Sequence, residues 1–289
     1  MNTKSRISIA TALLATAGLG LAACGGSTAP GTGSNGTSAP SNEPLTVMAD
    51  VKPHAELIKK AQEDGLLGDV QVKVTEISGQ IDPNKLVQDG DMDANFFQHV
   101  PYLKNWNAEN NGTLVEVATV HVEPLGLYSK KVGNAQALPD GSTIAIPQDP
   151  TNLARGLFLL SDAGLLTMDV KADDPNLDYS KVTTKNVTGN PKNIKFIEID
   201  RPQLAATLDD PKVAMSIVNG NYALEAGLTP ETDAKFLEKA ANNPYANVLV
   251  TSEKLKDDPR VKKLAEALTS QQIKDYIKTT YKGSVLPAE

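Results

Sequence analysis

Short apolar runs that alternate with helical patterns from residue 45 onward constrain the fold more than any other feature of the sequence. This alternation is typical of α/β units built around largely parallel sheets. It continues to the end of the chain and is longer than a usual single doubly wound sheet, so it predicts two α/β lobes. The expected strands are 45–48, 70–76, 114–120, 125–129, 143–146, 194–199, 213–218 and 246–250, and the expected helices are 54–66, 150–164, 201–208 and 261–281.

Two of the expected strand segments, 125–129 and 213–222, bracket a self-contained β-α-β block. We expect them to carry the chain to the second lobe and back, as two hinge crossings with a ligand cleft between the lobes. The expected boundaries are 45–124 plus 223–289 for lobe 1 and 125–222 for lobe 2. Because ligands of open α/β folds bind at the carboxyl ends of strands, the residues that follow each strand are the candidates for a site.

The amino terminus has a different character. Residues 1–23 combine Lys4 and Arg6 with an apolar core and contain no acidic residue, which is typical of a secretory signal peptide. The string that ends at Cys24 resembles the bacterial lipobox, in which the cysteine is acylated and the chain is cleaved before it; the alternative is a buried cysteine on a short transmembrane helix. Residues 24–44 predict a lipidated Cys24 followed by a flexible tether rich in Gly, Ser, Thr and Pro.

Composition excludes several classes of protein. With 40% hydrophobic and 22% charged residues, the chain fits a soluble globular domain rather than a disordered or membrane-embedded protein. Its formal net charge of -7 argues against nucleic-acid binding, and a single cysteine excludes an internal disulfide framework.

An aromatic cluster in 94–106 is the densest chemical signal in the sequence. Phe96 and Phe97 are adjacent, so in a strand their side chains point to opposite faces and one is free to line a cleft. His99 follows two residues after Phe97, and Pro101 opens a helix that carries Tyr102. Such a cluster suits an apolar or thioether side chain, although packing of the same aromatic residues in the core is the alternative.

Two polar signals follow expected strands. Asn152 and Arg155 are three residues apart in the first turn of the expected helix 150–164, so they share one face near its positive end, where a guanidinium can bind a carboxylate. Asn219 comes directly after the strand 213–218 and can offer a donor and an acceptor to a zwitterion; turn formation is the alternative.

Metal binding and catalysis are the alternatives to the binding of a small organic ligand. His121 and Glu123 project to one side of an extended chain, and His54 and Glu56 have the same spacing, so a metal receptor is an alternative. The sequence contains no nucleophile elbow, phosphate loop or dinucleotide fingerprint, which disfavours a hydrolase-like or other enzyme. We therefore expect a binding protein without a cofactor or a bound metal.

Several strings together resemble the methionine-binding lipoproteins of ABC importers, the NlpA/MetQ family. They are residues 21–24, 53–54, 95–103, 123–129, 146–155 and 219–223. The resemblance implies a two-lobed, periplasmic-binding-protein-like fold that captures L- or D-methionine and delivers it to a permease with an ATPase subunit. It also implies a lipid anchor on the extracytoplasmic face of the cell membrane. Another apolar amino acid or a methionine-containing dipeptide is the alternative ligand.

Carried onto this chain, the resemblance implies that Arg155 and Asn152 bind the ligand carboxylate and that Asn219 serves its polar end. The expected ligand-binding residues are Phe97, His99, Tyr102, Glu123, Asn152, Arg155 and Asn219, with the first three around the ligand's side chain. The sequence departs from its relatives at Gln80, where they often have tyrosine, and at 50–52, where they usually have a small, glycine-containing turn.

Overall fold

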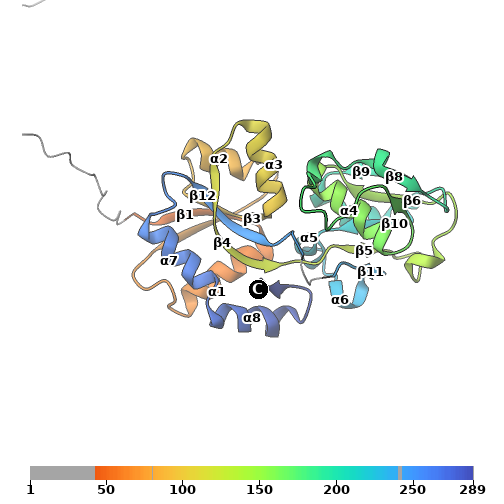
Figure 1. Cartoon of the computed structure of the whole chain (residues 1–289). Coiled ribbons are helices and arrows are strands. Elements are labelled where there is room, and N and C mark those ends of the chain that lie inside the picture. The colour runs from red at the N-terminus through yellow and green to blue at the C-terminus, as the bar shows by residue number, and fades with distance from the viewer. Residues whose placement is uncertain (1–42, 80, 240–242, 289) are drawn as a thin grey trace, which may run out of the picture. The chain divides into compact units, whose positions relative to one another are not determined.

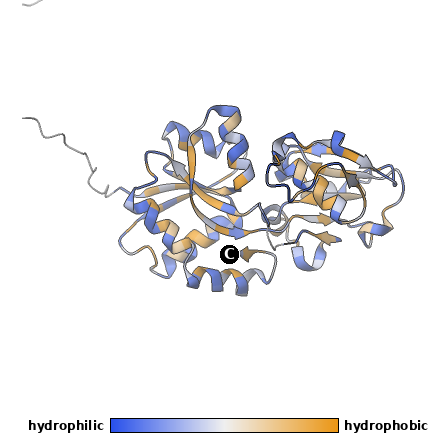
Figure 2. Cartoon of the chain, in the orientation of Figure 1, coloured by the Kyte–Doolittle hydropathy of each residue, from blue (hydrophilic) through white to orange (hydrophobic). Residues whose placement is uncertain are grey.

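Two sheets organise the computed structural model, which describes residues 43–79, 81–239 and 243–288 (Figure 1). The signal segment, Cys24, most of the tether and Gln80 lie outside the described residues. The first sheet has the order β13-β4-β12-β3-β1-β2 and the second the order β11-β5-β10-β6-β9. Hydrophobic residues concentrate on the strands and on the helix faces that cover them (Figure 2).

The first lobe is a mixed sheet. β1 pairs in parallel with β2 and β3, whereas β12 is antiparallel to β3 and β4, and β13 is antiparallel to β4. Its strands are β1 (Leu45–Ala49), β2 (Val72–Glu76), β3 (Ala94–His99), β4 (Leu114–Val122), β12 (Asn247–Ser252) and β13 (Leu286–Pro287). The elements around it are a helical turn (Val51–Ala55), α1 (Glu56–Glu63), α2 (Pro83–Asp89), α3 (Val100–Asn110), α5 (Gly220–Glu225), α7 (Pro259–Leu268) and α8 (Gln271–Tyr281).

The second lobe is smaller. β10 lies between β5, to which it is antiparallel, and β6, which pairs in parallel with β10 and β9. Its strands are β5 (Gly126–Tyr128), β6 (Thr143–Pro147), β9 (Lys195–Ile199), β10 (Met215–Val218) and β11 (Phe236–Leu237), with a separate pair, β7 (Thr167–Met168) and β8 (Val187–Gly189). Its helices are α4 (Pro150–Asp162), α6 (Pro230–Asp233) and five 3-10 turns at Ala135–Ala137, Tyr179–Lys181, Thr184–Asn186, Arg201–Gln203 and Ala205–Asp209.

The structure adds α2, α5, α6, β7, β8, β11 and β13 to the expected elements and differs from them at three further segments. β3 is absent from the expected strands. All six of its residues are buried, because it is a central strand between β1 and β12 and is covered by α2 and α3 and by the core of the first lobe; a strand covered on both faces shows no alternation. The expected helix 201–208 is two 3-10 turns, and the expected helix 261–281 is divided into α7 and α8. Ser270 causes the second break, because its hydroxyl accepts from the Ile273 N–H and caps α8.

Between the two sheets the chain crosses after β4 and after β10, and it then returns once more to the second sheet to form β11. The chain leaves the first sheet after β4, enters the second at β5 and leaves it after β10. It then returns to add β11 beside β5, although the expected boundaries assign this segment to lobe 1, and only afterwards forms β12 of the first sheet. The exact lobe boundaries remain a prediction.

Candidate functional site

The expected binding residues gather where strands of both sheets end. Phe97 and His99 belong to β3, and Tyr102 lies in the first turn of α3. Asn152 and Arg155 lie in the first two turns of α4, where the Asp149 carboxylate accepts from the Asn152 N–H and fixes the start of the helix. Asn219 follows β10 directly.

The two adjacent phenylalanines divide between core and cavity, as strand alternation predicts. Phe96 is fully buried in the hydrophobic core of the first lobe. Phe97 instead lines a cavity of about 490 Å³ together with Tyr102, and the two rings meet edge to face with centroids 5.8 Å apart. Phe97 also lines a smaller cavity of about 20 Å³, shared with His99, Arg155 and Asn219.

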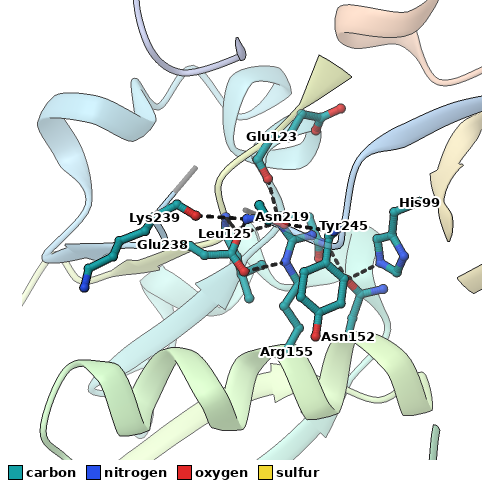
Figure 3. A network of polar contacts seen from close by, with 10 residues as sticks. His99, Glu123, Leu125, Asn152, Arg155, Asn219, Glu238, Lys239 and Tyr245 are labelled. Carbon is teal, nitrogen blue, oxygen red and sulfur yellow. Dashed lines mark hydrogen bonds and ion pairs between the residues drawn. The ribbon is translucent and has the colours of Figure 1, made fainter. Parts of the chain in front are cut away.

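His99, Asn152 and Asn219 form a buried polar group that joins the lobes (Figure 3). The Tyr102 N–H donates to His99 Nδ1 at 3.1 Å, so His99 Nε2 carries the ring proton and donates to Asn152 Oδ1 at 3.2 Å. Asn219 Nδ2 donates to the same oxygen at 2.8 Å, and the buried Asn219 Oδ1 has no hydrogen-bond partner among the described residues. Burial, and secondarily the Arg155 charge, hold the pKa of His99 well below its usual value, so the ring is neutral.

Arg155 is held by the carboxylate of Glu238, which is not among the residues expected from the sequence. Its Nε donates to Glu238 Oε1 at 2.9 Å, and its Nη2 donates to Glu238 Oε2 at 2.6 Å and to the backbone oxygen of Glu123 at 2.7 Å (Figure 3). The guanidinium carbon lies 4.4 Å from the ring centroid of Tyr245. Burial alone would lower the pKa of Arg155, but the Glu238 carboxylate outweighs it and raises the pKa. Among the described residues, Nη1 makes no hydrogen bond, so one edge of the guanidinium is available.

The Glu123 carboxylate contacts the rings of two histidines. Its Oε1 lies 2.7 Å from His121 Nε2 and 3.4 Å from His54 Nε2, and all three side chains are buried. Burial would raise the pKa of Glu123, but the histidines outweigh it and lower the pKa, whereas burial lowers the pKa of His54 to about 4. The donor atoms of the three residues lie within 4.8 Å of one another, a spacing that could hold a metal ion. Glu56, which the sequence pairs with His54, instead accepts from the Tyr281 hydroxyl.

Residues outside the expected set also line the site. Asp50 and Arg201 line the larger cavity, while Glu238 and Tyr245 position Arg155. Asp50 follows β1 directly and Arg201 comes two residues after β9, so inspection of every strand end could have found both. Glu238 and Tyr245 lie 83 and 90 positions from Arg155, and no local pattern connects them to it.

Comparison with known proteins gives one consistent family. The family model described as NlpA lipoprotein matches residues 45–289. The methionine-binding lipoprotein MetQ of Bacillus subtilis strain 168 is 37% identical over 257 residues, which cover 88% of this chain and 92% of that protein. The D-methionine-binding lipoprotein MetQ of Escherichia coli strain K12 is 37% identical over 232 residues, 80% of this chain and 82% of that protein.

Solved structures agree with the sequence matches. A nutrient-binding protein from Burkholderia cenocepacia bound to methionine has a TM-score of 0.78 at 35% identity and covers 85% of this chain and 100% of that chain. Lipoprotein Tp32 from Treponema pallidum has a TM-score of 0.77 at 36% identity over 86% of this chain and 100% of that chain. The expected two-lobed, periplasmic-binding-protein-like fold is thereby confirmed. From its sequence matches, its two lobes and its cavity-lining residues, the chain belongs to the NlpA lipoprotein family.

Proposed function

We propose that this chain is a lipid-anchored receptor that captures methionine and delivers it to an ABC importer without chemical change. The observation that carries the proposal is the position of Arg155: it is buried and oriented by Glu238, and its Nη1 edge is available beside a cavity that Phe97 lines. The names of the relatives, methionine-binding and D-methionine-binding lipoproteins, support the same ligand.

The polar end of the ligand would bind the second lobe. Arg155 Nη1 would donate to the ligand carboxylate, a charge-assisted bond that burial strengthens. Asn152 would assist through its amide, and Asn219 Oδ1, which has no partner among the described residues, would accept from a donor on the ligand. Glu123 would act through its backbone oxygen, which fixes Arg155 Nη2.

The side chain of the ligand would bind the first lobe. Phe97 and Tyr102 both line the larger cavity, and aromatic contacts stabilise a thioether sulfur. His99 lies between the two groups, because it contacts the Tyr102 ring on one side and Asn152 on the other. A ligand that contacts both lobes favours their closed arrangement, which is the form we propose is delivered to the permease and its ATPase.

Attachment to the membrane would depend on Cys24. None of the helices in the described ranges 43–79, 81–239 and 243–288 is long and apolar enough to cross a bilayer. We propose that acylated Cys24 tethers the domain to the extracytoplasmic face of the cell membrane. A Cys24→Ala variant should leave the membrane fraction or remain an unprocessed precursor; a processed variant that still fractionates with lipid would contradict the anchor.

Ligand identity is tested on the purified mature domain. Mass spectrometry of small molecules released by denaturation should detect methionine, and calorimetry should rank L- and D-methionine above alanine and above other apolar amino acids. Recovery of unchanged methionine after incubation would support binding without turnover. If a methionine-containing dipeptide or another amino acid binds more tightly, the receptor role stands with a different ligand; if none of these ligands binds, the proposed function is wrong.

A further inference from the structure

Asp50 is a buried acidic residue at the end of β1, with only 4% of its surface exposed. Its N–H donates to the backbone oxygen of Phe96, and its own backbone oxygen accepts from the Ala55 N–H at 2.9 Å. The strand ladder therefore fixes its position at the carboxyl end of the parallel strands, where its side chain lines the larger cavity with Phe97 and Tyr102.

The Asp50 carboxylate forms no ion pair among the described residues, although the Arg201 charge acts on it from the wall of the same cavity. Oδ2 accepts from Asn221 Nδ2 at 2.9 Å, and no Lys, Arg or His nitrogen of the described chain forms an ion pair with it. Arg201 lines the same cavity, but its Nε lies 3.2 Å from Asp149 Oδ2 and its guanidinium stacks on Tyr102 at 4.9 Å. A buried carboxylate with one neutral donor is costly unless a cation reaches it.

Asn221 connects this carboxylate to the Arg155 region. Its side chain bonds Asp50 at the larger cavity, and the residue also lines the smaller cavity beside Arg155 and Asn219. Both cavities share Phe97 and Arg201 as wall residues. Asp50 and Arg155 thus line two cavities with common walls, so one anionic and one cationic side chain lie on either side of the shared residues, as a zwitterion would require.

We propose that Asp50 binds the ammonium group of the ligand, so that the site selects amino acids with a free α-amino group and discriminates against deaminated analogues. This assignment rests on the proposed function, because it assumes that Arg155 binds the carboxylate of the same molecule. The ammonium would supply the direct ion pair that the buried Asp50 lacks, and Asn219 Oδ1 could accept a second of its three N–H bonds.

Proton linkage follows from the environment of Asp50. Burial raises the pKa of Asp50 to about 7, and the negative charges of Glu123 and Glu225 also raise it. The positive charge of Arg201 and the hydrogen bond from Asn221 lower the pKa but do not outweigh burial. Tyr222 also faces Asp50, and its phenol stays neutral because burial raises its pKa. A bound ammonium favours the ionised carboxylate, so binding near neutral pH should release a proton. Affinity should therefore rise with pH up to and just beyond about 7.

The variant test compares methionine with 4-(methylthio)butanoic acid, which has the same carboxylate and thioether but lacks the amino group. The parent protein should prefer methionine by about a hundredfold or more, on the order of 3 kcal/mol. Asp50→Asn should reduce the preference to less than about tenfold, mostly through weaker methionine binding. Asp200→Asn is the matched control, because Asp200 lines the same cavity and should leave the preference unchanged.

A second measurement needs no variant. Calorimetry of methionine binding to the parent protein in two buffers of different ionisation enthalpy should reveal proton release near pH 7 that is mostly lost about one pH unit higher, below the range in which the amino group of free methionine titrates. No proton release, or an Asp50→Asn variant that keeps the full preference, would overturn the assignment. If the parent binds methionine and its deaminated analogue equally, only this inference is wrong; if it binds neither, the proposed function is wrong as well.

Discussion

The Arg155–Glu238 pair makes a quantitative prediction about how the site is preorganised. The Arg155 side chain is 3% exposed and that of Glu238 is 14% exposed, and two parallel hydrogen bonds join them. Replacing Arg155 with Met leaves the Glu238 carboxylate with the Leu125 N–H and the Asn243 amide as its neutral donors. Replacing Glu238 with Gln leaves a buried guanidinium without a carboxylate, although one amide oxygen at position 238, the Glu123 backbone oxygen and the Tyr245 ring can still contact it.

Each single substitution should therefore cost about 3 to 5 kcal/mol of unfolding free energy, because each leaves one buried charge without its partner. The double variant Arg155→Met/Glu238→Gln removes both charges and should be destabilised by far less than the sum, with a coupling energy of about 3 kcal/mol. Arg155→Met rather than Ala keeps most of the side-chain volume, so that a cavity does not dominate the result.

The assay is urea unfolding of the ligand-free mature domain, followed by far-UV circular dichroism. Fluorescence of Trp106, the chain's one tryptophan, reports separately on the first lobe. The Lys130–Asp209 pair is a suitable control, since both side chains are more than half exposed and its cycle should show little coupling. Additive costs for Arg155 and Glu238 would refute the view that Glu238 positions Arg155.

Three further predictions concern the cavity and the histidines. Phe97→Ala should weaken methionine binding by about 2 to 4 kcal/mol, because burial and a sulfur-aromatic contact are lost, and should change the weak binding of alanine far less. If calorimetry gives equal losses for both ligands, Phe97 has only a structural role. Since the folded-state pKa of Asp50, about 7, lies above its unfolded value of 3.8, its contribution to stability falls as the pH rises from about 4 through about 7. At pH 8, Asp50→Asn should therefore stabilise the ligand-free domain by up to about 4 kcal/mol relative to the parent, whereas at pH 4 it should have almost no effect. Thermal unfolding of both proteins at the two pH values measures this difference. Methionine affinity should be unchanged by excess chelator if His54, His121 and Glu123 act as a hydrogen-bonded group, whereas chelator-sensitive binding would favour the metal alternative.

The local sequence was sufficient to predict where several side chains of the site point. Strand alternation separated Phe96 from Phe97, and helical spacing placed Asn152 and Arg155 together at the start of α4. Both predictions depend on residues within one turn or one strand, where backbone geometry alone fixes which side chains share a face. The alternation of strands and helices likewise predicted α/β lobes.

Long-range contacts were decided by the tertiary structure. β3 is a central strand whose two covered faces erase the alternation that would reveal it, so its pairing with β1 and β12 is visible only in the folded chain. Glu238 reaches Arg155 across 83 positions and Asn221 reaches Asp50 across 171. Such pairs form because the ends of distant strands meet at one edge of the sheets, and no periodicity in the sequence records which ends will meet. The sequence by itself therefore determined which faces carry the binding groups, and packing of the two sheets decided which charges these groups meet.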